Sequence, residues 1–294
     1  MKIVIGLPAY NEEKNVASII MRLKEITNQI IVCNDGSTDL TAKIAESMGA
    51  SVVNHSKNLG YGAAIKSIFS KFIETDGDIL VTFDADGQHR IEDIINVVQP
   101  IIKNEADVVI GSRFLSADQE MPTYRKIGIK TITNLTNTTI DTKITDSQSG
   151  FRAYAKRVFP AVIPFEHGMG VSTEILIKAN KNGFRIKEIP ITTLYGDDTS
   201  THNPVSHGFS VILSTMKFIS IEHPLKFYGI PGIIFLAIGL FFVGWTLQYF
   251  TTFRVFPPIL ALIAIGFTLF GLVFLMTSIM LYSLVNIVRE GKRS

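Results

Sequence analysis

Short apolar runs alternate with amphipathic stretches over the first 111 residues. Runs of strand length lie at 2–7, 29–34, 51–54, 79–83 and 107–111. Between them, apolar side chains recur every three or four positions, as from Val16 to Ile26, which indicates one buried face of a helix. A run that is apolar at every position predicts a strand buried on both faces of a parallel sheet. Strands that alternate with helices require right-handed crossovers, so the pattern predicts an α/β fold with a doubly wound, mostly parallel sheet.

Two local signals bound the first of these elements. Pro8 is expected to close the first strand, because proline cannot donate a hydrogen bond to a central ladder. Asn11 is a candidate cap for the helix that follows, because its side-chain oxygen can accept from a free amide of the first turn.

The pattern changes after Gly111. Tyr124 to Thr139 has a basic start and one apolar face, which predicts a helix. That helix can pack on the domain or lie as an interfacial amphipathic helix in the headgroup region of a membrane. A strand is expected near 151–154 and an extended segment at 185–195, followed by a polar loop at 196–204.

The C-terminal part of the chain is strongly apolar. Neither Phe227 to Phe250 nor Val255 to Val288 contains a charged residue. Each run exceeds the roughly 20 residues that a helix needs to cross a bilayer. Pro257 and Pro258 delimit the second run at its start, so the pattern predicts a hairpin of two transmembrane helices at about 227–250 and 258–284.

Positive charge is unevenly distributed around this hairpin. Five basic residues flank its outer ends and one lies in its turn: Lys217, Lys226, Arg289, Lys292 and Arg293 against Arg254. An excess of lysine and arginine marks the cytoplasmic side of a membrane protein. We therefore predict a multi-pass protein of the cell membrane. The domain at 1–224 and both termini are expected in the cytoplasm, and residues 225–294 are expected to form the membrane anchor.

Composition excludes several classes of function. The net charge is +2 and no dense block of lysine and arginine occurs, so a nucleic-acid partner is not indicated. The single cysteine, Cys33, excludes an intrachain disulfide and a cysteine-based zinc cluster. The chain has no GxGxxG after its first strand and no GxxxxGK[ST], so neither a dinucleotide fold nor a P-loop is signalled.

Polar residues gather where three of the predicted strands end. They lie at 8–12, 34–37 and 84–86. Each segment alone is compatible with ordinary turn chemistry. The carboxyl ends of parallel strands meet at one edge of a sheet, where open α/β folds bind ligands, so their convergence favours a nucleotide site. Asp84 and Asp86 offer paired oxygen donors that suit Mg²⁺ or Mn²⁺.

Five motifs in order resemble one family. They are PAYNE at 8–12, NDGSTD at 34–39, DADGQH at 84–89, GSRF at 111–114 and DSQSGFRAY at 146–154. Together they resemble the family 2 glycosyltransferases, which have a GT-A (Rossmann-like) fold. The likeness is closest to the transferases that attach a sugar to a polyprenyl phosphate, such as dolichyl-phosphate mannose and glucose synthases. Five motifs in sequence are far more specific than any one of them.

The resemblance implies a set of binding residues. The nucleotide base and ribose would lie among Pro8, Tyr10, Glu12 and Asp35. The metal and the diphosphate would be held by Asp84, Asp86 and Gln88, with Ala85 nearby and Arg113 also facing the donor.

Two arginines are candidate clamps for an acceptor phosphate. Arg113 and Arg125 carry the planar guanidinium that binds phosphate with two parallel hydrogen bonds. Either can instead be one half of an ion pair. The family often has a basic segment near the polar loop, whereas this chain has Thr199 to Asn203 there. His202 and His207 are interpreted as solvated loop residues.

The implied reaction is metal-dependent, inverting transfer of a hexose from a nucleotide diphosphate-sugar to polyprenyl (dolichyl) phosphate, with Asp86 and Arg113 as the catalytic residues. GDP-mannose is the favoured donor, and UDP-glucose and UDP-N-acetylglucosamine are the alternatives. A polysaccharide-synthase-like glycosyltransferase is a further alternative, but the QxxRW motif expected of it is missing from the sequence.

Overall fold

The computed structural model describes residues 1–87, 89–116, 121–166, 168, 170–192, 216, 220–221 and 223–290. The chain divides into two compact units, Met1–Thr215 and Met216–Ser294. Several predicted features lie outside the described residues, including Gln88, the polar loop at 196–204 with His202, and also His207, Lys217, Lys292 and Arg293. The side chains of Tyr124 and Arg289 are likewise outside them.

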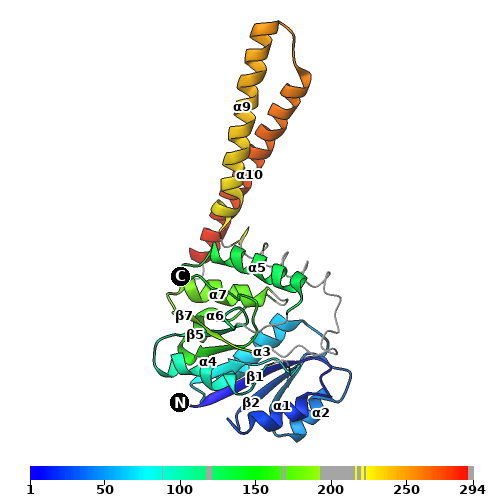
Figure 1. The fold of residues 1–294 in the computed structure, drawn as a ribbon, viewed down its shortest axis with the longest axis vertical. Coiled ribbons are helices and arrows are strands. Elements are labelled where there is room, and N and C mark those ends of the chain that lie inside the picture. Colours follow the sequence, from blue (N-terminus) through cyan, green and yellow to red (C-terminus); the bar gives the residue numbers. More distant parts are fainter. Residues whose placement is uncertain are drawn as a thin grey trace. The chain divides into compact units, whose positions relative to one another are not determined.

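The first unit contains a seven-stranded mixed sheet (Figure 1). Its strands are β1 (Ile3–Ala9), β2 (Ile30–Asn34), β3 (Ser51–Asn54), β4 (Ile79–Thr82), β5 (Val108–Ser112), β6 (Arg152–Ala155) and β7 (Ile186–Pro190). Their order is β3-β2-β1-β4-β6-β5-β7. β6 runs antiparallel to β4 and β5, and the other pairs are parallel. The predicted α/β fold class, with a mostly parallel sheet, is confirmed.

Helices cover both faces of this sheet (Figure 1). They are α1 (Val16–Leu23), α2 (Thr41–Ser47), α3 (Tyr61–Ile73), α4 (Asp93–Ile102), α5 (Thr123–Asn137), α6 (Phe159–Val162) and α7 (Val171–Lys181), with a 3₁₀ turn, η1, at Lys156–Val158. The buried residues of α1 and α4 form one apolar core with Leu7 and Val81 of the sheet. On the other face Phe69 of α3 packs edge-on against Tyr154 of β6, with ring centroids 5.1 Å apart. The sheet is therefore buried on two sides, as its continuous apolar runs require.

The first strand is longer than its sequence suggests. β1 continues through Pro8, which pairs with Cys33 of β2. The pairing of β1 with β4 ends two residues earlier, at Gly6 and Thr82. The backbone N–H and C=O groups of the even-numbered residues of β1 point toward β4, since the Gly6 carbonyl accepts from the Phe83 amide. The N–H that Pro8 lacks would point toward β4, beyond the end of the pairing between β1 and β4, so no hydrogen bond of the sheet is lost. The prediction that the first strand ends at Pro8 is therefore wrong.

Asn11 does not cap a helix either. It adopts a left-handed backbone conformation, with φ of 56°. Its side-chain oxygen accepts from the amide of Thr38, 2.9 Å away, and α1 begins only at Val16. The side chain therefore ties the loop after β1 to the loop after β2, two of the segments expected at the site.

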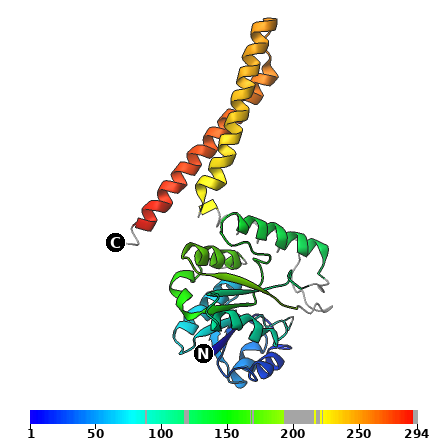
Figure 2. The same ribbon diagram turned by 60° about the vertical axis from the view of Figure 1, so that its left-hand side comes forward.

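The second unit is a helical hairpin (Figure 2). After a π-helical turn, η2 (Leu225–Gly229), α9 (Ile230–Phe253) and α10 (Pro258–Glu290) run side by side. Glycines allow the close approach: a Cβ on Gly239 would lie 2.6 Å from the amide nitrogen of Thr268. The apolar spans, Leu225–Phe253 and Pro258–Ile287, are long enough to cross a membrane, and only 11% of an 18-residue apolar window within each is buried. Such exposed apolar surface indicates association with a membrane.

Candidate active site

The carboxyl ends of β1, β2 and β4 place the polar motif residues at one edge of the sheet. Tyr10, just past β1, is 39% exposed, and Pro8 is half-buried. Glu12 is also half-buried and accepts a hydrogen bond from Asn15 Nδ2 at 2.9 Å. Burial raises the pKa of Glu12, and the negative charges of Asp86, Asp39 and Asp84 raise it further. The structure therefore gathers an acidic group from the first motif with the two aspartates of the third.

Asp84 follows the end of β4 and is enclosed on several sides. Its Oδ1 accepts from Tyr61 Oη at 3.3 Å, and its Oδ2 lies 3.4 Å from His89 Nε2. Burial acts to raise the pKa of Asp84, but the hydrogen bond and electrostatic interaction with His89 and the positive charge of Arg113 outweigh it, so its pKa lies below the ordinary value. A side chain at Gly150 would intrude here, since its Cβ would lie 2.7 Å from Asp84 Oδ2. The carboxylate is thus ionised and confined.

The donor set around Asp84 and Asp86 fits a hard divalent cation. Asp84 and Asp86 are partly accessible, whereas Ala85 between them is buried. Gly87 adopts a left-handed φ of 74°, and a Cβ there would meet nothing within 4 Å. In the described part of the chain, no three or more His, Cys, Asp or Glu side chains are grouped to hold a metal. Mg²⁺, however, usually takes one or two carboxylates and completes its shell with water and substrate phosphate.

Asp35 holds a neighbouring loop in place. The carboxyl group is buried, and its Oδ1 lies 2.7 Å from His55 Nδ1 and accepts from the Leu59 amide at 2.9 Å. Its Oδ2 accepts from the Gly60 amide at 2.9 Å. Gly36 must be glycine, because its φ is 72° and a Cβ would lie 2.3 Å from the backbone of Lys57. The segment expected to bind a base is therefore packed tightly onto residues 55–60.

Sequence reasoning missed His55. Its Nε2 lies 2.8 Å from Ser67 Oγ of α3 and 3.6 Å from Cys33 Sγ of β2. Both contacts come from residues that are distant in sequence, and a lone histidine carries no spacing signal. Its role as the partner of Asp35 becomes visible only once the fold brings β2, β3 and α3 together.

Arg113, which follows β5, forms a buried ion pair. Its Nε and Nη2 donate to the two carboxylate oxygens of Asp146 at 2.7 and 2.9 Å, and its backbone amide donates to Oδ2 at 3.2 Å. Burial acts to raise the pKa of Asp146, but the charge and hydrogen bonds of Arg113 lower it below the ordinary value. Glu188 of β7 supports the arrangement, since it accepts from the amides of Thr145 and Asp146 at 2.7 and 2.9 Å. One end of the guanidinium is thereby fixed in orientation.

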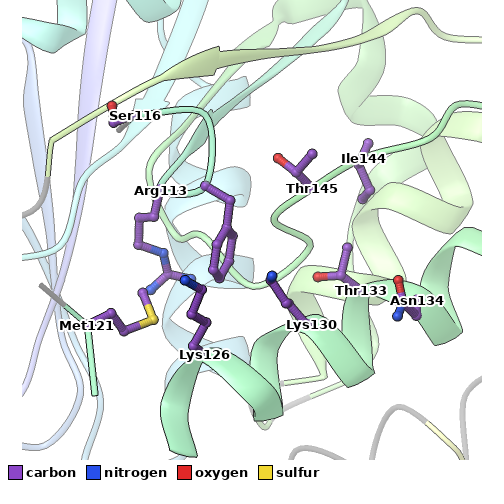
Figure 3. Close-up of a pocket in the computed structure, with 10 residues that line it drawn as sticks. Arg113, Ser116, Met121, Lys126, Lys130, Thr133, Asn134, Ile144 and Thr145 are labelled. Atoms are coloured by element: carbon purple, nitrogen blue, oxygen red, sulfur yellow. The ribbon is translucent and has the colours of Figure 1, made fainter. Parts of the chain in front are cut away.

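A cavity of about 560 Å³ opens beside Arg113 (Figure 3). Its lining includes two lysines of α5, Lys126 and Lys130, which project from the helix toward the segment that carries Arg113. Lys130 Nζ also lies 5.9 Å from the centroid of the Phe114 ring. Among the residues that the structure describes, the lining contains no carboxylate. Three cations around one cavity make it suited to an anionic group such as a phosphate.

Arg125, the other predicted phosphate clamp, is not part of this lining. It is exposed on α5, while its neighbour Lys126 faces the cavity. Lys126 and Lys130 are four residues apart, a spacing that places them on one face of a helix. That spacing was present in the sequence and could have identified the pair.

An α/β domain with confined carboxylates at the edge of its sheet, and a cationic cavity beside them, is suited to binding anionic substrates together with a divalent cation. Residues 4–162 match the family described as glycosyl transferase family 2. The chain belongs to this family, and it is a glycosyltransferase.

Two similar proteins are named as transferases of dolichyl or dolichol phosphate. The UDP-N-acetylglucosamine–dolichyl-phosphate N-acetylglucosaminyltransferase of Methanococcus voltae is 34% identical, over 74% of this chain and 93% of its own length. The dolichol-phosphate mannosyltransferase of Pyrococcus furiosus is 31% identical, over 65% and 56% of the two chains. Among solved structures, glucosyl-3-phosphoglycerate synthase of Mycobacterium tuberculosis with Mn²⁺ and UDP-glucose shares the fold, with a TM-score of 0.59, 21% identity and coverage of 74% and 78%.

Proposed function

We propose that this enzyme transfers a sugar from a nucleotide diphosphate-sugar to a polyprenyl phosphate, at the cytoplasmic face of a membrane. Residues 1–224 are the catalytic domain and residues 225–294 the anchor. The observation that carries the proposal is the cationic cavity lined by Arg113, Lys126 and Lys130. Arg113 connects this cavity with the donor side, because its charge also lowers the pKa of Asp84. A site for a phosphate acceptor beside a site for a diphosphate donor is what this reaction requires.

On the donor side, the nucleotide would lie along the edge formed by Pro8, Tyr10, Glu12 and Asp35. The diphosphate and a Mg²⁺ or Mn²⁺ ion would be held by Asp84, Asp86 and Gln88. When bound, such an ion supplies Lewis-acid stabilisation of the negative charge that develops on the departing nucleoside diphosphate. Asp84 supports this role because its lowered pKa keeps it ionised.

On the acceptor side, the phosphate would occupy the cavity beside Arg113. Its second pKa is about 6, so a phosphate monoester is largely dianionic in the cytoplasm and can attack without a general base. Glu174, the buried carboxylate of α7, is not assigned as a general base, because its oxygens have other partners. It accepts from the amides of Phe165 and Glu166, both at 2.8 Å, and pairs with Lys178. Attack on the anomeric carbon from the side opposite the leaving group would invert its configuration.

Arg125 keeps a separate proposed role in this arrangement. It lies on the same helix as Lys126 and is exposed. From there it would attract the acceptor phosphate from outside the cavity, while Arg113, Lys126 and Lys130 would bind it within. The proposal therefore enlarges the set of acceptor residues expected from the sequence.

Two donors deserve a direct comparison. GDP-mannose is the donor that we favour, and a mannosyltransferase is among the similar proteins. The relative from Methanococcus voltae is named for UDP-N-acetylglucosamine and matches a larger share of both chains, which favours that donor as the second candidate.

The proposal is tested by assaying the purified full-length enzyme with radiolabelled donors. We expect label from GDP-mannose or UDP-N-acetylglucosamine to move into an organic-extractable lipid when a polyprenyl phosphate is present. UDP-glucose completes the panel, and the corresponding polyprenol without its phosphate is the control acceptor. Label that remains water-soluble with every donor, or transfer that proceeds equally to the polyprenol, would refute the proposed acceptor.

The proposed orientation is tested by labelling one introduced cysteine. Thr252, near the end of α9, is exposed and lies next to the turn that is expected outside the cell. A Thr252→Cys variant should react with an impermeant thiol reagent added to intact cells. Cys33 should not contribute to the signal, because it is 0% exposed and burial raises the pKa of its thiol to about 12. Cys33→Ala in the same variant is the matched control. Labelling that occurs only after the membrane is opened would mean that this turn lies in the cytoplasm, and the proposed orientation would be wrong.

A further inference from the structure

Three consecutive residues join the two ends of the candidate donor site. The amides of Leu59 and Gly60 donate to the carboxylate of Asp35, each at 2.9 Å. The next residue, Tyr61, begins α3, and its hydroxyl donates to Asp84 Oδ1 at 3.3 Å. Asp35 and Asp84 follow different strands of the sheet. The segment from Leu59 to Tyr61 therefore connects the end assigned to the nucleotide with the end assigned to the diphosphate.

The connecting segment has little freedom to move. Gly60 adopts a φ of 97°, a conformation that other residues rarely reach. Asp35 is itself held by His55, which also contacts Ser67 in the middle of α3. Hydrogen bonds from two directions thus fix the start of the helix that carries Tyr61, and with it the position of the phenol.

The surroundings of the phenol point to one purpose for its hydroxyl. A Cβ on Gly150 would lie 2.5 Å from Tyr61 Oη and 2.7 Å from Asp84 Oδ2, so the three groups are in close contact. On the other side of the carboxylate is His89, which packs against the rings of Phe83 and Phe151 with centroids 5.6 and 5.2 Å away. A phenol donates and an ionised carboxylate only accepts, so Tyr61 can fix the direction in which Asp84 points.

We infer that Tyr61 is a positioning residue, which sets the orientation of Asp84 for the divalent cation and the donor diphosphate. The inference rests on the proposed role of Asp84. Partners that orient a metal-binding side chain typically contribute about 10- to 100-fold to metal affinity or activity. Tyr61 would act only through Asp84 and would not touch the substrate.

The test measures Mn²⁺ binding as well as turnover. Tyr61→Phe removes one oxygen atom and retains the ring. We expect the Kd for Mn²⁺, measured by electron paramagnetic resonance on full-length protein with saturating UDP or GDP, to rise roughly tenfold. The value of kcat should fall while the KM for polyprenyl phosphate stays unchanged, because the acceptor cavity is untouched.

Tyr154→Phe is the matched control. Tyr154 is a tyrosine of the same domain that is 2% exposed, and it packs against Phe69. Loss of its hydroxyl should change thermal stability without changing Mn²⁺ affinity. Equal weakening of Mn²⁺ binding in both variants would mean that Tyr61 contributes only to the packing of the domain.

A double-mutant cycle separates action through Asp84 from an independent effect. In an Asp84→Asn background, Tyr61→Phe should cause no further loss of Mn²⁺ affinity. If the two losses multiply, or if Tyr61→Phe alone binds Mn²⁺ as the wild type does, the inference is overturned. Failure of the proposed function looks different: no donor would yield a labelled lipid, while the effect of Tyr61 on Mn²⁺ binding would persist.

Discussion

Replacing Asp86 by asparagine should reduce sugar transfer by at least about a hundredfold, in line with the several kcal/mol that metal assistance contributes to catalysis. The substitution keeps the shape of the side chain but removes a formal charge from a site that suits a hard cation. The measurement is the initial rate of lipid labelling at saturating donor and acceptor.

The same argument predicts that a chelator abolishes turnover of the wild-type enzyme and that added Mg²⁺ or Mn²⁺ restores it. Asp93→Asn is the control substitution, since Asp93 lies at the start of α4 and accepts from the backbone of Thr192 at 3.2 Å. That variant should transfer at the wild-type rate. Thermal melting of the Asp86 variant should match the wild type, because a partly accessible carboxylate contributes little to folding. Full activity in excess chelator would refute a metal-dependent mechanism.

Periodicity was sufficient to predict most of the elements of the first unit. Each expected strand appears within a few residues, because apolar runs that are buried on both faces leave few alternatives to a central strand. Periodicity could not predict the order of the strands in the sheet. β6 was expected as a strand, but its insertion between β4 and β5, antiparallel to both, depends on contacts between residues distant in sequence. The error at Pro8 has the same origin, since it depends on where the neighbouring strand ends.

The candidate site was predictable where motif and strand end coincide. Asp84, Asp86 and Glu12 follow strand ends and are brought together by the sheet, as expected. The direction of side chains was harder to predict. Arg125 and Lys126 are adjacent, yet successive residues of a helix point about 100° apart, so only one of them lines the cavity.

Partners of the site residues were the least predictable part. Asp146 pairs with Arg113, and Tyr61 contacts Asp84, across separations of 33 and 23 residues. Nothing in local sequence spacing reports such contacts. They depend on loops that meet only when the sheet is complete, which is why an arginine proposed as a clamp could not be assigned its carboxylate in advance.

The ion pair with Asp146 makes the prediction for Arg113 more specific. Asp146 accepts from Nε and from Nη2, so the guanidinium can contact the cavity only with its remaining N–H groups. A lysine has one nitrogen and cannot pair with Asp146 on one side while spanning a phosphate on the other. Hydrogen bonds to charged groups are worth roughly 1.5–3 kcal/mol, so loss of one corresponds to about a 10- to 100-fold effect.

Arg113→Lys should therefore raise the KM for polyprenyl phosphate, or lower kcat, by about 10- to 100-fold, with nucleotide binding unchanged. Arg157→Lys is the matched control. Arg157 pairs with Asp107, which lies at the opposite end of β5 from Arg113. Each variant keeps a cation beside its aspartate, so neither leaves a buried carboxylate without a counter-charge. The two proteins are compared in steady-state assays and in titrations with UDP and GDP. Equal activity of the two lysine variants would show that Arg113 serves only its ion pair, and the acceptor phosphate would then be assigned to Lys126 and Lys130 alone.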